Sequence, residues 1–251
     1  VFGGQKRLIE VLRYAEEEFS PTRMAVIGTC VSLIIGEDLE AAVEMADLNT
    51  GTIAVDIHAG FTENIDGVIA TLEPAFRAGW ISGDELTRQK ELLRKANEVE
   101  RLRGAAVKSY IEPSRGDLKH EAGCRLLDLV REGKKGVAVM NAKKETAYMF
   151  ADILLGLHDA VPDAGITYSL NLEERGLPKV RRDAERISRE LTERGLEYIS
   201  QGAPDEYGAT GDLLGAWIAD QHPDFALITG VPHAIPAEYL TGIECFSVTN
   251  G

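Results

Sequence analysis

The sequence predicts an α/β protein with two Rossmann-like lobes, each a doubly wound parallel sheet, joined by a long helical connection. Short apolar runs alternate with stretches of helical spacing along most of the 251 residues. Continuous apolar runs are typical of strands that are buried on both faces of a parallel sheet. The β-α-β order then requires right-handed crossovers, which place helices on both faces of each sheet.

The first lobe is expected to cover residues 1–81. Leu8, Leu12 and Phe19 share one face of a helix, and Met24 opens the first apolar run. The chain begins at Val1 without an initiator Met, so we expect this lobe to be incomplete at its N-terminus. The expected elements are helices at 5–19, 37–46 and 64–77 and strands at 24–29 and 52–57.

The helical connection is expected at residues 82–116. Ser82 and Glu85 have the spacing of a capping box, and a long charged helix follows to about Arg103. Pro113 and Gly116 then interrupt the chain.

The second lobe is expected at residues 117–251. Pro178 is well placed in the first turn of one of its helices. The expected helices lie at 117–131, 178–194 and 212–220, and a further helix that ends at His158 follows the strand at 136–141. The expected strands lie at 136–141, 166–170, 197–200, 225–229 and 244–249.

Charge and cysteine content exclude several classes of protein. The formal net charge of −14 argues against a nucleic-acid-binding surface and against docking on an anionic membrane. No apolar run approaches the roughly 20 residues that span a bilayer. The three cysteines are odd in number and widely spaced, which indicates a reducing, cytoplasmic compartment.

Five loops follow the predicted strands, and ligands of open parallel sheets bind beyond the carboxyl ends of strands. The loops are 28–32, 58–63, 141–146, 201–207 and 230–236. The first carries Cys30, whose thiolate the nearby backbone N–H groups would favour, so Cys30 is a candidate metal or cluster ligand. A buried, inert cysteine is the alternative. Cys124 and Cys245 are expected to pack inside a helix and a strand.

The loop from Asn141 to Thr146 joins a strand to a helix N-terminus and carries Lys143 and Lys144. Backbone N–H groups, the helix dipole and two ammonium groups suit a carboxylate or phosphate. Lys143, Lys144 and Thr146 are therefore candidate substrate-binding residues. The P-loop pattern is absent, and two solvated lysines are the alternative.

His58 and His233 each follow a predicted strand, which makes them candidate catalytic residues. A structural hydrogen-bonding role is the alternative for both. The other histidines lie on or beside predicted helices and are expected at the surface.

Several motifs together resemble the nitrogenase component-1 superfamily. Val1-Phe2-Gly3-Gly4, Thr29-Cys30 and Ile35-Gly36-Glu37-Asp38 resemble the superfamily as a whole. Four further segments resemble one branch, the nitrogenase-like subunits of Ni-sirohydrochlorin a,c-diamide reductive cyclases. These segments are 55–61, 112–118, 140–146 and 228–236. The resemblance covers essentially the whole chain, but the family's upstream Gly-Pro-x-Gly-Cys segment is not present in it.

The resemblance implies a fold, a cofactor and a reaction. A nitrogenase-reductase-like ATPase partner would pass electrons to a 4Fe-4S cluster shared between two copies of the chain, with Cys30 as one thiolate ligand. The nickel tetrapyrrole substrate would be reduced and closed to a lactam, with nickel present only as part of the substrate. The product would serve the biosynthesis of the methanogenic nickel tetrapyrrole coenzyme.

Two other interpretations remain open. One is a different nitrogenase-like relay or cofactor-assembly subunit, such as a protochlorophyllide-reductase-like protein. The other is a non-catalytic, two-lobed α/β protein that closes on a small molecule.

Overall fold

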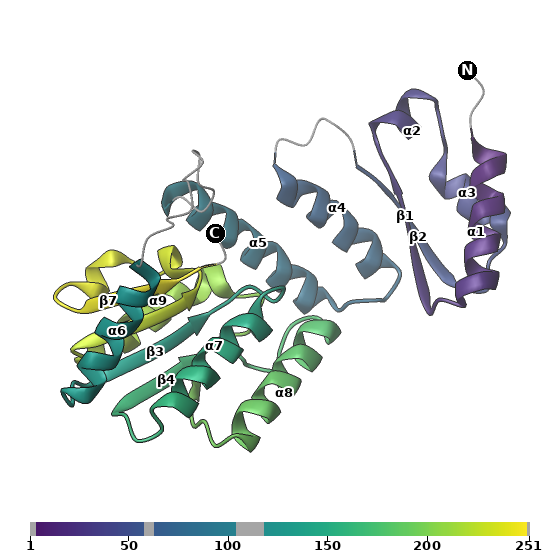
Figure 1. Cartoon of the computed structure of the whole chain (residues 1–251). Helices are drawn as coiled ribbons and strands as arrows, with labels where there is room; N and C mark the ends of the chain where they lie inside the picture. The colour runs from purple at the N-terminus through teal and green to yellow at the C-terminus, as the bar shows by residue number, and fades with distance from the viewer. Residues whose placement is uncertain (1–3, 58–62, 104–117, 250–251) are drawn as a thin grey trace. The chain divides into compact units, whose positions relative to one another are not determined.

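The computed structural model describes residues 4–57, 63–103 and 118–249 and divides into two compact units, Val1–Glu91 and Leu92–Gly251 (Figure 1). Every strand pair among the described residues is parallel, which confirms the predicted α/β class. The division falls within helix α5 (Gly83–Arg103). The predicted boundaries at residues 81 and 116 therefore stay a prediction.

Unit 1 contains a two-stranded parallel sheet of β1 (Arg23–Gly28) and β2 (Gly51–Asp56). Their register runs from Arg23 opposite Gly51 to Gly28 opposite Asp56. Both strands lie within a residue of their predicted positions. The helices of this unit before α5 are α1 (Gln5–Phe19), α2 (Cys30–Ile34), α3 (Leu39–Ala46) and α4 (Asn64–Arg77).

Side-chain caps fix two helix starts in unit 1. The Asp38 carboxylate accepts a 2.9 Å hydrogen bond from the Ala41 backbone N–H, so α3 begins at Leu39 and not at residue 37 as predicted. Glu63 and Asp66 form a capping box at the start of α4. Such caps satisfy backbone donors that have no partner inside the helix.

Unit 2 is built on a five-stranded parallel sheet with the order β5-β4-β3-β6-β7. Counted from the first strand of this unit, the order is 3-2-1-4-5, which is the Rossmann arrangement. β3 and β4 have the predicted bounds, whereas β5 is shorter than the predicted 197–200. The strands are β3 (Gly136–Asn141), β4 (Ile166–Leu170), β5 (Ile199–Ser200), β6 (Phe225–Gly230) and β7 (Glu244–Val248).

Helices cover both faces of this sheet (Figure 1). Along β3, Ala138 and Met140 pack into the core that α7 (Ala147–Ala160) and α8 (Pro178–Glu193) complete. Val137 and Val139 point to the other face and pack against α9 (Tyr207–Gln221). All six residues of β3 are buried, as expected for a central strand of a doubly wound sheet.

Two cysteine predictions for unit 2 are wrong, because Cys124 and Cys245 are both exposed. Cys124 lies on α6 (Leu118–Arg131), two residues before the half-buried Leu126. Residues two positions apart in a helix are separated by about 200° around the axis, so Cys124 points away from the core. Cys245 lies on the edge strand β7, where Phe246 takes the face that packs against the core.

Among the described residues, no helix combines the length and the apolar character that crossing a membrane requires.

Candidate functional site

The carboxyl ends of β3 and β6 form the topological switch point of unit 2. From β3 the chain proceeds to β4 on one side, whereas β6 lies on the other side. The two connections therefore diverge, and the space beyond the strand ends is where ligands of such sheets bind. The predicted loops 141–146 and 230–236 both begin here.

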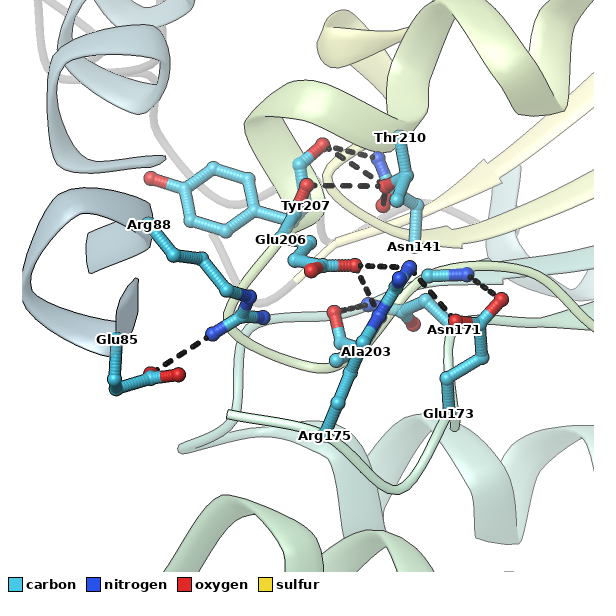
Figure 2. Close-up of polar contacts among 11 residues, drawn as sticks. Glu85, Arg88, Asn141, Asn171, Glu173, Arg175, Ala203, Glu206, Tyr207 and Thr210 are labelled. Carbon is cyan, nitrogen blue, oxygen red and sulfur yellow. Dashed lines mark hydrogen bonds and ion pairs between the residues drawn. The ribbon is translucent and has the colours of Figure 1, made fainter. Parts of the chain in front are cut away.

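Asn141, the last residue of β3, connects these loops to α9 (Figure 2). Its side-chain amide donates to the Tyr207 carbonyl at 3.0 Å, and its side-chain oxygen accepts from the Thr210 hydroxyl at 2.8 Å. Its backbone carbonyl accepts from the Val231 N–H at 2.9 Å. Asn141 is fully buried, so these bonds fix the relative positions of three segments.

Asn171 makes a matching connection directly after β4. Its side chain donates to the Ala142 carbonyl at 2.8 Å and accepts from the Ala142 N–H at 3.0 Å. It also donates to the Ala203 carbonyl at 3.3 Å. Asn171 thereby holds both the N–H and the carbonyl of Ala142, the residue before Lys143.

Lys143 contacts two side chains from outside its own loop. Its Nζ lies 2.9 Å from Oε1 of Glu100 on α5 and 4.8 Å from the ring centroid of Tyr207 at the start of α9. The second contact has the geometry of a cation–π interaction. Glu100 uses one of the three N–H donors of the ammonium group, which leaves donors for a ligand carboxylate.

The structure separates Lys143 from the other two predicted substrate-binding residues. The exposed Lys144 pairs with the adjacent Glu145 at 3.6 Å. Thr146 is the N-cap of α7, but its hydroxyl donates to the Lys143 carbonyl at 3.3 Å instead of capping the helix. Of the three, Lys143 is the residue that contacts Glu100 and Tyr207, and these three residues form the cluster around Lys143.

His233 lies in the 3-10 turn η1 (Pro232–Ala234), directly beyond β6. Gly230 has a φ of 99°, which glycine adopts without strain, and this lets the chain turn toward η1. The Nε2 atom of His233 is buried and has no hydrogen-bond partner among the described residues. An unpaired buried nitrogen is costly, so it marks a position where a ligand group would be accommodated.

Charge and burial act together on the groups of this cluster. Burial lowers the pKa of His233, Glu100 opposes this effect, and Lys143 adds to it. Burial alone would raise the pKa of Glu100, but hydrogen bonds from Lys143 and Tyr207 outweigh it, so the pKa of Glu100 is lowered. Burial and the bond to Glu100 raise the pKa of Tyr207. At neutral pH these shifts favour a charged Glu100, a neutral His233 and a protonated Tyr207.

Gly211 on α9 allows the helix to touch the turn that carries His233. A Cβ at this position would lie 1.9 Å from the Ala234 backbone oxygen. We therefore expect Gly211→Ala to displace the turn and to lower the free energy of unfolding by about 1–3 kcal/mol, measured by urea denaturation.

The matched control for Gly211→Ala is Gly156→Ala on α7, where an added Cβ meets nothing within 4 Å. Alanine favours a helix over glycine, so this variant is expected to be neutral or slightly stabilising. Equal stability of the two variants would contradict the close approach of α9 and η1.

A second charged cluster, not predicted from the sequence, lies at the same edge of the sheet (Figure 2). Arg175, in the loop after β4, pairs with Glu206 at 3.0 Å and with Glu173 at 2.7 Å. Glu206 also accepts a 2.8 Å hydrogen bond from the Ala203 N–H. These contacts connect the loops after β4 and β5. The rule that ligands bind beyond the carboxyl ends of strands would also have selected the loop at 171–177 as a candidate.

A hollow of about 210 Å³ lies between α7 and α8, with Tyr148, Asp152 and Glu190 in its lining. Pockets for small molecules usually measure roughly 300–1,000 Å³. The hollow shares no residue with the cluster around Lys143, and we assign it no function.

In unit 1, Cys30 is half-buried and is the first residue of the short helix α2, directly beyond β1. The predicted loop at 28–32 is thus partly helical. The Ser32 hydroxyl fastens the turn, because it accepts from the Thr29 N–H at 2.8 Å and donates to the Thr29 carbonyl at 2.7 Å. Gly28 leaves no room for a side chain, since a Cβ would lie 2.6 Å from the Asp56 carboxylate.

The donor set for a metal or cluster is incomplete within the part of the chain that the structure describes. No group of three or more His, Cys, Asp or Glu side chains there could hold a metal ion. A 4Fe-4S cluster normally takes four thiolates, of which Cys30 could supply one. Cys30 therefore fits the role of a single ligand, whereas the described residues alone do not fit a complete cluster site. His58 lies outside the described residues.

Comparison with known proteins identifies relatives of the whole chain and a family model that matches its first part. The family model of nitrogenase component 1 type oxidoreductases matches residues 1–87. In Methanosarcina acetivorans, component CfbD of the Ni-sirohydrochlorin a,c-diamide reductive cyclase complex is 46% identical, over all of this chain and 70% of the relative. The CfbD component of Methanothermobacter thermautotrophicus is 43% identical, over all of this chain and 71% of the relative. The nitrogenase iron-molybdenum cofactor biosynthesis protein NifE of Rippkaea orientalis is 30% identical, over 30% of this chain and 19% of the relative.

Proposed function

The chain belongs to the CfbD family of Ni-sirohydrochlorin a,c-diamide reductive cyclase components, and we propose that it is the catalytic subunit of such a complex. The observation that carries the proposal is identity of 41–46% over 95–100% of the chain to three CfbD components. In the proposed reaction the nickel tetrapyrrole is reduced and an acetamide arm closes to a lactam. The reaction would serve the biosynthesis of the methanogenic nickel tetrapyrrole coenzyme.

We propose that Lys143 binds a carboxylate of the macrocycle and that His233 delivers a proton during reduction. Lys143 has N–H donors beyond the one that Glu100 accepts, and charged donors form strong bonds with carboxylates. The Nε2 atom of His233 is unpaired among the described residues, and burial lowers the pKa of this histidine. An arriving anion would raise its proton affinity again, so protonation would follow substrate binding. Lys144, Thr146 and His58 remain proposed contributors to the same functions.

We propose that Cys30 is one ligand of a 4Fe-4S cluster whose other ligands lie outside the described residues. Such a cluster supplies single-electron relay when bound, and a nitrogenase-reductase-like ATPase partner would deliver the electrons. The Cys30 thiol is half-exposed and lies directly beyond β1, which supports its role as a ligand.

A homodimer is the proposed assembly, with the cluster shared between the two copies. Three large apolar side chains beside Cys30 support a protein interface at this place. Ile27 is 54% exposed, Val31 is 67% exposed and Ile34 is 83% exposed. The three described cysteines are all free thiols, which supports a reducing, cytoplasmic location.

The test of the proposed function is reconstitution under anaerobic conditions. Full-length protein would be mixed with a nitrogenase-reductase-like ATPase, ATP, a reductant and Ni-sirohydrochlorin a,c-diamide. We expect a hydrogenated, cyclised tetrapyrrole by mass spectrometry, formed only with ATP. Conversion of a chlorophyll-type tetrapyrrole instead would support another relay subunit. Tight binding of the nickel tetrapyrrole without conversion would support a non-catalytic binding protein.

A variant of Lys143 tests the binding step. Lys143→Met removes the charged donor but keeps a similar apolar stem, so we expect the KM for the tetrapyrrole to rise about tenfold or more, since a hydrogen bond to a charged group contributes about 1.5–3 kcal/mol. Steady-state kinetics of the reconstituted complex measures this change. Lys134→Met is the control, because Lys134 precedes β3 at the opposite end of the sheet and pairs with Asp224. An unchanged KM in Lys143→Met would contradict the assignment.

A further inference from the structure

The side chain of Glu100 connects two segments that both border the switch point. Its Oε1 atom accepts a hydrogen bond from Lys143 Nζ at 2.9 Å and another from the Tyr207 hydroxyl at 2.8 Å. Lys143 lies in the loop after β3, and Tyr207 is the first residue of α9. One carboxylate oxygen on α5 thus fixes the orientation of both side chains.

Packing holds the Glu100 part of α5 in place independently of these bonds. Val99 is 3% exposed and packs with Val231, Ala234 and Tyr207. Next to this contact, a Cβ on Gly208 would lie 2.8 Å from the Cα of Ala96, so α9 approaches the α5 backbone directly. The carboxylate is therefore presented from a fixed backbone and does not rely on a flexible ion pair.

Glu100 also balances charge beside His233. The carboxylate of Glu100 and the ammonium of Lys143 act on the imidazole in opposite directions, and burial of the ring adds to the effect of Lys143. Without Glu100, no carboxylate of this ion pair would oppose the effect of the Lys143 ammonium on His233. The ring nitrogen Nε2 is buried without a described partner, so its proton affinity responds strongly to such charges.

We propose that Glu100 is a positioning residue of this site: it orients Lys143 and Tyr207 and balances the charge around His233 without contacting the substrate. Its effect on turnover rests on the proposed function, whereas its effect on His233 does not. If Glu100 were only one half of a partly exposed, structural ion pair, replacing it would leave the pKa of His233 unchanged.

The test follows the titration of His233 by NMR in full-length protein that carries ¹³C-labelled histidine. Glu100→Gln removes the negative charge, so we expect the pKa of His233 to fall below its value in the unmodified protein. Glu100→Asp keeps the charge but is one methylene shorter, so the pKa of His233 should stay closer to that value. Glu98→Gln is the matched control, since Glu98 is an exposed residue of the same helix and pairs with Lys95.

Kinetics of the reconstituted complex supply the second readout. In Glu100→Asp the shorter side chain no longer reaches both Lys143 and Tyr207, and in Glu100→Gln the uncharged amide oxygen holds the Lys143 ammonium less strongly, so we expect kcat to fall about tenfold to hundredfold. The limb of the pH profile that reports His233 should move to lower pH in Glu100→Gln and not in Glu98→Gln.

The outcomes separate the two proposals. An unchanged titration of His233 in Glu100→Gln would overturn the positioning role, whether or not the complex turns over. A shifted titration without any conversion of the tetrapyrrole by the unmodified protein would retain the role of Glu100 and remove the proposed function. If Glu100→Gln does not fold, the Glu100→Asp variant decides, because a kcat equal to that of the unmodified protein overturns the proposal.

Discussion

If Cys30 is a ligand of the proposed 4Fe-4S cluster, replacing it with Ala in the full-length protein removes most of the bound iron and acid-labile sulfide. Even a change in the outer shell of a metal site typically costs about 10- to 100-fold in metal affinity, and loss of a ligand costs at least as much. We therefore expect iron per protein chain to fall about tenfold or more after anaerobic purification, together with the visible absorbance of the cluster and with turnover.

The two other cysteines provide matched controls for this variant. Cys124 and Cys245 are exposed and belong to unit 2, and neither has the strand-to-helix position of Cys30. Cys124→Ala and Cys245→Ala should therefore keep the iron content of the unmodified protein. An unchanged iron content in Cys30→Ala, with an intact circular dichroism spectrum, would remove Cys30 from the proposed ligand set.

The central strands β3 and β6 of unit 2 could be predicted because each is a mostly apolar run that is buried over its whole length. β3 and β4 begin and end where the apolar runs Gly136–Asn141 and Ile166–Leu170 do. A central strand of a parallel sheet is buried on both faces, so its sequence carries a strong local signal. The same rule selected the loops of Lys143 and His233, because strand ends define the ligand-binding edge.

The contacts of Lys143 with Glu100 and Tyr207 could not be predicted, because no local sequence pattern shows that these residues approach the loop after β3. Glu100 lies on a highly charged helix whose sequence is typical of a solvated surface. What brings it to the site is the contact of α9 with the α5 backbone at Ala96, which a side chain on Gly208 would prevent. The sequence predicts a loop at 201–207, whereas Tyr207 is the first residue of α9.

Adjacent residues of one loop can also have different contacts, which their positions in the sequence do not reveal. Lys143 and Lys144 are adjacent, yet the first contacts Glu100 and Tyr207 and the second pairs with Glu145. The difference arises because Asn171 holds both polar groups of the Ala142 backbone and so fixes the direction in which the chain leaves β3. A tertiary contact therefore determines which lysine reaches the switch point.

Asn171→Leu is expected to cause the largest loss of stability among single substitutions at this edge. Asn171 is fully buried, and its side chain satisfies the Ala142 N–H, the Ala142 carbonyl and the Ala203 carbonyl. Leucine fills a similar volume but leaves the Ala142 N–H and the Ala142 carbonyl without this partner, whereas the Ala203 carbonyl still accepts from the Glu206 N–H at 2.9 Å. Each unsatisfied buried group costs about 1–3 kcal/mol, so we expect the free energy of unfolding to fall by about 3–5 kcal/mol, measured by urea denaturation.

Asn171→Asp separates the loss of donors from the loss of the acceptor. Aspartate still accepts from the Ala142 N–H but cannot donate to the two carbonyls, and its buried charge adds a cost of its own. Because the loop that follows Ala142 carries Lys143, we expect both variants to speed hydrogen–deuterium exchange in peptides covering residues 142–146. Unchanged exchange in this loop, together with a stability loss below about 1 kcal/mol in Asn171→Leu, would show that the backbone direction beyond β3 is set by other contacts.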